Sequence, residues 1–96
     1  MPRLHTHPGE ILAEEYLKPL RLSARALGEA IGVSGNRISD IMRQRRDVSA
    51  DTAIRLGRFF DVDPRFWLNL QAAYDLSVAE RKNDYSSVRP RSATAA

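Results

Sequence analysis

The sequence predicts an all-α domain of five helices, and three observations lead to that fold class. First, a residue that can cap a helix N-terminus stands directly before each of four segments, namely Ser23, Ser34, Ser49 and Asp63. Second, apolar residues inside these segments recur at intervals of three and four residues, as they do along one face of a helix. Third, no stretch alternates between apolar and polar residues, which is the pattern of a half-buried strand.

The first helix is expected to begin at Pro8 and to run to about Leu17. Proline suits the first helical position, where no amide partner is lost, and Glu10 just behind it completes the start pattern. Pro19 is expected to stop this helix, because a proline inside a helix removes a hydrogen bond and clashes with the preceding turn.

The second and third helices are expected within residues 23–42, which read SARALGEAIGVSGNRISDIM. Gly32 can supply the positive φ that a sharp turn between two short helices requires. Gly28 places a small residue where the third helix, at about residues 35–45, would cross the second. This pattern is typical of a helix-turn-helix, although short apolar helices joined by glycine also occur in plain helical bundles.

The fourth helix is expected after Ser49, and the fifth should cover about residues 64–80, with Pro64 in its first position. The apolar residues of the fifth helix cover nearly its whole circumference, so it must be buried on more than one side. We expect one side to meet the core of the domain and another to meet a second copy of the chain. The predicted dimer interface consists of Phe66, Trp67, Leu70 and Tyr74.

The last residues, 81–96, carry no apolar period and are rich in Ser, Arg and Ala. They are expected to form a flexible basic tail behind a helix-turn-helix domain that spans residues 1–80. Such a tail can contact DNA phosphates as an arm, or it can serve as a solubilising end, and the sequence leaves both open.

The composition excludes several classes of protein. A chain of 96 residues with 43% hydrophobic and 28% charged residues is an ordinary small globular domain. It has neither a signal-peptide core nor an apolar run of the roughly 20 residues that a membrane-spanning helix needs. Cysteine is absent, so no disulfide framework or thiolate metal site can form. We therefore expect a cytoplasmic protein with no membrane contact.

Arginines are concentrated in and just after the third helix. Arg37, Arg43, Arg45 and Arg46 face only Asp40 between positions 34 and 46, whereas residues 1–80 as a whole carry equal numbers of basic and acidic side chains. A local basic patch on a neutral body indicates an anionic partner, although a merely solvated cluster gives the same pattern. The alternative for Arg37 and Arg43 is a weak ion pair with Asp40, one helical turn away.

We predict that the partner is double-stranded DNA and that the third helix enters its major groove. Arginine suits guanine and asparagine suits adenine, so specificity should reside mainly in Asn36 and Arg37. The predicted base-reading residues are Ser34, Asn36, Arg37, Ser39, Asp40 and Arg43. The predicted phosphate contacts are Ser23, Arg25, Arg45 and Arg46, which lie near a helix N-terminus or at the exit of the third helix.

Four segments of the chain form a distinctive set: LHTHPGEIL at 4–12, NRISDI at 36–41, VSADTAIRLGRFF at 48–60 and PRFWLNLQAAYDL at 64–76. Together they resemble HigA-type antitoxins of the XRE (lambda-repressor-like) helix-turn-helix family. The resemblance covers residues 4–80. It implies a lambda-repressor-like fold in a bacterial cytoplasmic protein that dimerises through its C-terminal helix and represses its own toxin–antitoxin operon. It also implies a HigB-type toxin as partner, an mRNA-cleaving ribonuclease of the RelE fold.

The chain departs from that family at two positions. Gly28 stands where alanine is usual, and Asp40 occupies a base-reading position that is often basic or amide-bearing in relatives. The operator sequence therefore does not carry over from the family. A stand-alone XRE regulator without a toxin partner is the alternative function.

Other polar clusters do not indicate an enzyme or a metalloprotein. His5 and His7, which could form a metal site with Glu10, stand two positions apart ahead of a proline and should point in different directions. The chain has no further histidine, so we expect a helix cap and solvent contact instead. Glu14 and Glu15 should form a solvated face. No nucleophile elbow or phosphate-binding glycine loop is present, and neither catalytic residues nor a cofactor is expected.

Overall fold

The computed structural model describes residues 5–94 and is all-α in that range, as predicted. The elements are α1 (Pro8–Ile11), the π-helical segment η1 (Leu12–Leu17), α2 (Lys18–Leu20), α3 (Ala24–Ile31), α4 (Gly35–Met42), α5 (Ala50–Phe60), α6 (Pro64–Lys82) and α7 (Arg91–Thr94). The segments α1, η1 and α2 form one continuous helix, so the body of the domain has five helices. The first four residues of the predicted domain and the last two of the predicted tail lie outside the described residues.

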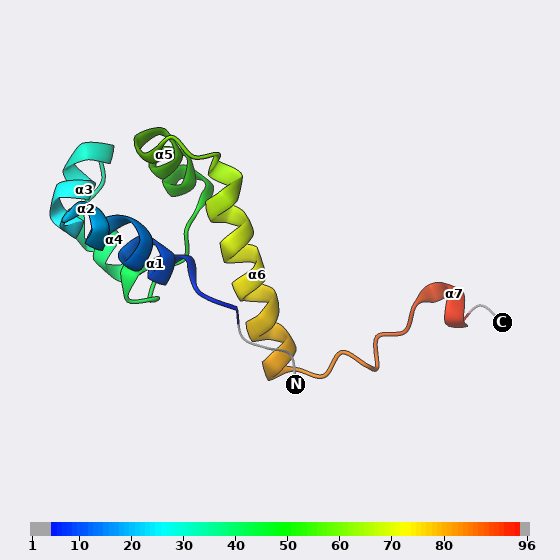
Figure 1. The fold of residues 1–96 in the computed structure, drawn as a ribbon. Coiled ribbons are helices and arrows are strands. Elements are labelled where there is room, and N and C mark those ends of the chain that lie inside the picture. Colours follow the sequence, from blue (N-terminus) through cyan, green and yellow to red (C-terminus); the bar gives the residue numbers. More distant parts are fainter. Residues whose placement is uncertain (1–4, 95–96) are drawn as a thin grey trace.

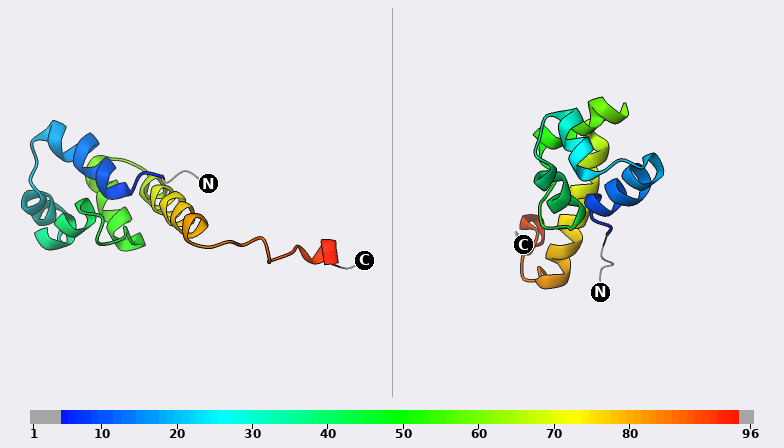
Figure 2. Two further views of the ribbon diagram at one scale, coloured as in Figure 1. Left: turned by 90° about the horizontal axis from the view of Figure 1, so that it is seen from below. Right: turned by 90° about the vertical axis from the view of Figure 1, so that its left-hand side faces the viewer.

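The helices before α6 gather around its first half (Figures 1 and 2). Helix α4 packs against α3 and α1, whereas α5 packs against α6 and α3. Near the other end of α6, the His5 amide donates a hydrogen bond to Ser77 Oγ at 3.0 Å. Residues 83–92 are exposed and lead away from the far end of α6. The overall extents of 59 × 22 × 20 Å reflect this protruding helix and tail.

A single apolar core lies where the helices meet. Trp67 is completely buried, with its ring centroid 5.1 Å from that of Tyr16. Gly9 brings α1 into backbone contact with α4, because a Cβ at this position would overlap the Ile41 carbonyl oxygen. The buried apolar residues are Leu12, Leu17, Leu27, Ile31, Ile38, Ile41, Val48, Ala53, Leu56 and Trp67.

The four predicted N-caps are confirmed. Ser23 accepts from the Ala26 amide, Ser34 from Arg37, Ser49 from Thr52 and Asp63 from Arg65. Pro64 occupies the first turn of α6, as expected. Each cap satisfies an amide that would otherwise lack a partner in the helix, and this explains why local sequence located these helix starts.

The predicted end of the first helix at Leu17 is wrong. The chain remains helical to Leu20. The helix ends at Arg21, which adopts the left-handed conformation with φ 52°. Within η1 the Lys18 amide bonds to the carbonyl of Ala13, five residues earlier. This wider turn offsets the carbonyl ladder and relieves the clash that Pro19 would make in a regular α-helix.

Helix α4 is shorter than the predicted 35–45, because it ends at Met42. Gln44 adopts a left-handed φ of 62°, and the Arg45 amide folds back to the Asp40 carbonyl at 2.8 Å. Arg45 and Arg46 therefore lie in a turn beyond the helix. Helix α6 is slightly longer than predicted and ends at Lys82.

His7 caps α1 but does not contact solvent as expected, because only 2% of its surface is exposed. Its Nδ1 accepts from the Gly9 amide at 2.9 Å, so the neutral ring carries its hydrogen on Nε2. Its ring meets that of Tyr74 edge-on, with centroids 4.8 Å apart. Burial lowers the pKa of His7 from 6.5, although the charges of Asp47 and Asp75 partly oppose this shift.

The free energy of unfolding is expected to fall as pH drops below 6.5, the ordinary pKa of the His7 side chain. The unfolded chain then takes up a proton on His7 that the folded chain binds less readily, and protonated Nδ1 cannot accept from Gly9. Urea titrations between about pH 7 and pH 5.5 measure this slope. His7→Asn, which can cap α1 without titrating, should flatten this slope. An unchanged slope in His7→Asn contradicts the assignment.

Candidate nucleic-acid interface

Helices α3 and α4 form a compact pair joined by the turn at Gly32. Gly32 has a φ of 78°, so it performs the predicted left-handed role. A Cβ on Gly28 would lie 2.7 Å from the Val33 carbonyl oxygen, which confirms a close approach at this position. The close approach occurs against the turn that leads into α4. These two glycines hold the pair in the geometry of a helix-turn-helix.

One side of α4 is free to meet a ligand. Ile38 and Ile41 bury the other side in the core, while Asn36 and Arg43 have exposed side chains and Asp40 is half-buried. Ser39 is also half-buried, and Ser34 is exposed at the helix start. The open side therefore carries an amide, a carboxylate and a guanidinium, which are groups able to discriminate base edges in a major groove.

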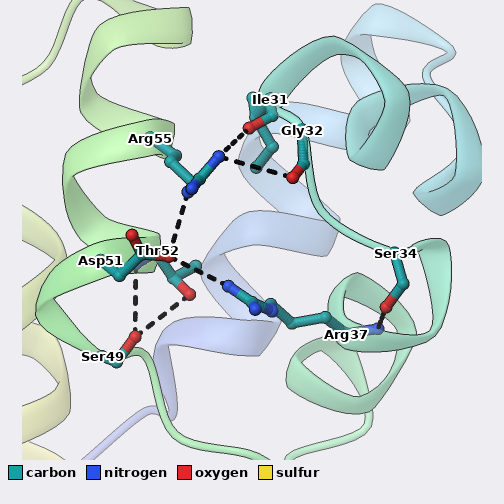
Figure 3. Close-up of polar contacts among 8 residues, drawn as sticks. All are labelled: Ile31, Gly32, Ser34, Arg37, Ser49, Asp51, Thr52 and Arg55. Carbon is teal, nitrogen blue, oxygen red and sulfur yellow. Dashed lines mark hydrogen bonds and ion pairs between the residues drawn. The ribbon is translucent and has the colours of Figure 1, made fainter.

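Arg37, the remaining predicted base-reading residue, points toward α5 (Figure 3). Its Nη1 lies 3.1 Å from Asp51 Oδ2, and the Arg55 Nε lies 3.0 Å from the same oxygen. Arg55 also donates from Nη1 to the carbonyl oxygen of Ile31 at 2.8 Å. The alternative in which Arg37 pairs with Asp40 is wrong, because Arg37 bonds across to Asp51 on another helix.

We refer to Arg37, Asp51 and Arg55 as the interhelix ion network. The hydrogen bond from Arg55, followed by that from Arg37, holds the pKa of Asp51 below its ordinary value of 3.8. The carboxylate therefore stays charged at neutral pH. Sequence reasoning missed Asp51 and Arg55, since they stand 14 and 18 positions after Arg37 and no local pattern connects them.

The predicted phosphate contacts lie on the surface near both ends of the helix pair. Ser23 caps α3, and Arg25 in the first turn makes only a loose ion pair with Glu29 at 3.5 Å. Both side chains of that pair are largely exposed, so an external phosphate can compete for Arg25. Arg45 and Arg46 are exposed in the turn after α4.

The predicted interface residues on α6 differ in exposure. Phe66 is 38% exposed, and Leu70 and Tyr74 are half-buried. The prediction that Trp67 lies in the dimer interface is wrong, because its side chain has no exposed surface and belongs to the core of its own chain. Leu76, which the prediction omitted, is 64% exposed. Helical spacing places Leu76 opposite the Trp67 side, and this signal was available in the sequence.

Comparison with known proteins identifies the family. Residues 14–67 match the helix-turn-helix family HTH_3. This chain belongs to that family. It is similar to virulence-associated protein I of Dichelobacter nodosus, with 57% identity over 81 residues that span 84% of this chain and 73% of that protein.

This helix-turn-helix protein is also similar to two solved structures from Pseudomonas aeruginosa. PA4674 in complex with its 18-bp operator DNA has 43% identity and a TM-score of 0.87, covering 94% of this chain and 99% of that one. The antitoxin HigA with the higBA promoter has 49% identity and a TM-score of 0.80, covering 81% of this chain and 85% of that one. The suspected resemblance to HigA-type antitoxins is thus confirmed.

Membership of the helix-turn-helix family agrees with the prediction that the protein is not an enzyme. Among residues 5–94, no three or more His, Asp or Glu side chains are grouped so as to hold a metal ion. No helix in this described part of the protein is long and apolar enough to cross a membrane.

Proposed function

We propose that this protein is a sequence-specific DNA-binding repressor that acts as a homodimer in the cytoplasm. The observation that supports this function best is the open side of α4, where Asn36, Asp40 and Arg43 stand free of the core. In this proposal α4 enters the major groove. Asn36 pairs with adenine, Arg43 with guanine, and Asp40 accepts from a cytosine amino group.

The surrounding residues position the helix on the DNA backbone in this proposal. Arg25 and the Ser23 hydroxyl meet phosphates beside α3, and Arg45 and Arg46 meet phosphates beyond α4. Ser34 and Ser39 supply smaller polar contacts at the groove edge. Arg37 contributes by linking α4 to α5 through the interhelix ion network.

The homodimer is proposed because one α4 reads only a few base pairs. A two-fold pair places two such helices about 34 Å apart on successive major grooves. Phe66, Leu70 and Tyr74 follow one another at four-residue spacing on one side of α6 and offer apolar surface for the contact. Charged substitutions at Leu70 and Tyr74 test this arrangement by light scattering, with circular dichroism as the control for folding.

We further propose that the protein is the antitoxin of a HigBA-type module that neutralises its toxin and represses its own operon. The similarity to P. aeruginosa HigA with the higBA promoter supports this proposal. The alternative is a stand-alone XRE regulator, since the α3–α4 pair is complete within one chain. The test is to look for a gene of a HigB-type ribonuclease beside this gene and to express the two together. The antitoxin proposal is supported if that ribonuclease is toxic and co-expression of this protein relieves its toxicity. The absence of such a gene supports the alternative.

Asn36→Ala and Arg43→Ala are each expected to weaken binding to the DNA upstream of the gene by about 5- to 150-fold. The reason is that a good bidentate base contact is worth about 1–3 kcal/mol. Binding to a scrambled duplex should hardly change. Fluorescence anisotropy with both duplexes measures the difference, and exposed Arg58 on α5 provides a matched Arg58→Ala control. Equal losses on both duplexes would show that these side chains contact phosphate instead.

A further inference from the structure

We infer that Asp51 and Arg55 are positioning residues that fix the recognition helix α4 for DNA reading through Arg37. The inference rests on the proposed DNA-binding function, in which neither Asp51 nor Arg55 touches DNA. One oxygen atom, Asp51 Oδ2, receives hydrogen bonds from Arg37 Nη1 at 3.1 Å and from Arg55 Nε at 3.0 Å.

The interhelix ion network joins α4 to α5, two helices that pack mainly on other neighbours. Helix α4 packs against α3 and α1, and α5 packs against α6 and α3. Arg37 reaches from α4 to the first turn of α5, so it links these two helices directly (Figure 3). The orientation of α4 relative to α5 and α6 therefore depends on a side-chain contact as well as on the core.

Arg55, the second arginine of the interhelix ion network, also contacts the turn of the helix-turn-helix. Arg55 Nη1 donates to the Ile31 carbonyl oxygen at 2.8 Å and to that of Gly32 at 3.4 Å. These carbonyls lie at the C-terminal end of α3, where the helix leaves them without amide partners. One guanidinium thus connects the turn before α4 to the carboxylate that holds Arg37. Lysine has no planar pair of donors and cannot make both contacts.

Exposure indicates that the network contributes more to orientation than to folding. The side chains of Arg37, Arg55 and Asp51 are 32%, 40% and 58% exposed. Ion pairs at such exposure add little to the free energy of unfolding. A small angular change in α4, however, moves every base-reading side chain at once, so DNA recognition is the property most sensitive to it.

The effect of removing Asp51 has opposite signs under the two possible roles of Arg37. If Arg37 reads a base and Asp51 only holds it while DNA is absent, Asp51→Ala frees Arg37 and removes a negative charge near the phosphates. Both changes tighten binding. If Asp51 positions α4, the same substitution weakens operator binding in spite of the more favourable charge.

The experiment measures binding of the full chain to the DNA upstream of its gene and to a scrambled duplex at one salt concentration. Asp51→Ala and Arg55→Lys are each expected to weaken operator binding on the order of tenfold. Scrambled-duplex binding should stay equal or become slightly tighter in Asp51→Ala. Asp51→Glu, which keeps the carboxylate, should recover most of the operator affinity. Arg58→Ala, on the same helix and outside the network, should leave the ratio of the two affinities unchanged.

A double-mutant cycle provides the second measurement. Because Arg37 and Asp51 act together, Asp51→Ala should cost little more in an Arg37→Ala background. Circular dichroism melting confirms that each variant is folded at the assay temperature. Tighter operator binding by Asp51→Ala, or full additivity in the cycle, overturns the inference. A wild-type protein that fails to distinguish the operator from the scrambled duplex overturns the proposed function itself.

Discussion

Replacing Trp67 by alanine is expected to lower the free energy of unfolding by about 3–5 kcal/mol, a large part of the stability of so small a domain. The side chain is completely buried, and its removal leaves a cavity between Tyr16 and the remaining core of α6. Because Trp67 is the only tryptophan, urea denaturation must be followed by far-ultraviolet circular dichroism.

Phe66→Ala is the matched control for this prediction. Phe66 is the neighbouring aromatic residue on α6 but is 38% exposed, so its truncation leaves less of a cavity and should cost less. Trp67→Phe should retain more stability than Trp67→Ala, since it keeps a ring in the core. A Phe66→Ala variant less stable than Trp67→Ala contradicts the placement of Trp67 at the centre of the fold.

Raising the salt concentration from about 50 to 200 mM is expected to weaken operator binding by about 10³-fold. In the proposed complex, Arg25, Arg45 and Arg46 make three phosphate contacts per chain, and the proposed dimer doubles this number. Each contact releases condensed counterions, so log affinity falls linearly with log salt. Fluorescence anisotropy over a salt series gives the slope.

Arg45→Ala separates this salt effect from base reading. It should reduce the slope of log affinity against log salt by about two, because each chain of a dimer loses one phosphate contact. It should also weaken binding to the operator and to the scrambled duplex alike. Arg58→Ala, a charge loss outside the proposed contact surface, controls for net charge. A salt slope near zero for the wild-type protein excludes phosphate contacts as the main source of affinity.

Local chemistry explains why the helix starts were predictable. Ser23, Ser34, Ser49 and Asp63 each satisfy an amide two or three positions away, so both partners lie within one short stretch of sequence. Gly32 was predictable for a similar reason, because its positive φ serves a turn between adjacent helices.

Features that depend on distant partners were not predictable in this way. The ion pair from Arg37 to Asp51 joins different helices, and a local rule instead suggested Asp40. The buried ring of His7 packs on Tyr74 of α6, and the buried ring of Trp67 packs on Tyr16 of the first helix. A helix whose apolar residues surround it shows that several sides are covered, but not which residue faces which neighbour.

The protruding end of α6 also determines how the chain yields to mechanical force. Residues 83–92 are exposed, so a protease that unfolds its substrates by pulling can bind this segment. Its pull passes directly into the last turns of α6, beyond the hydrogen bond between His5 and Ser77. Unfolding of α6 from this end reaches Tyr74 and then Trp67. It therefore removes the central core residue before the force reaches α3 or α4. Pulling on residues 83–92 should therefore unfold α6 while the α3–α4 pair is still formed.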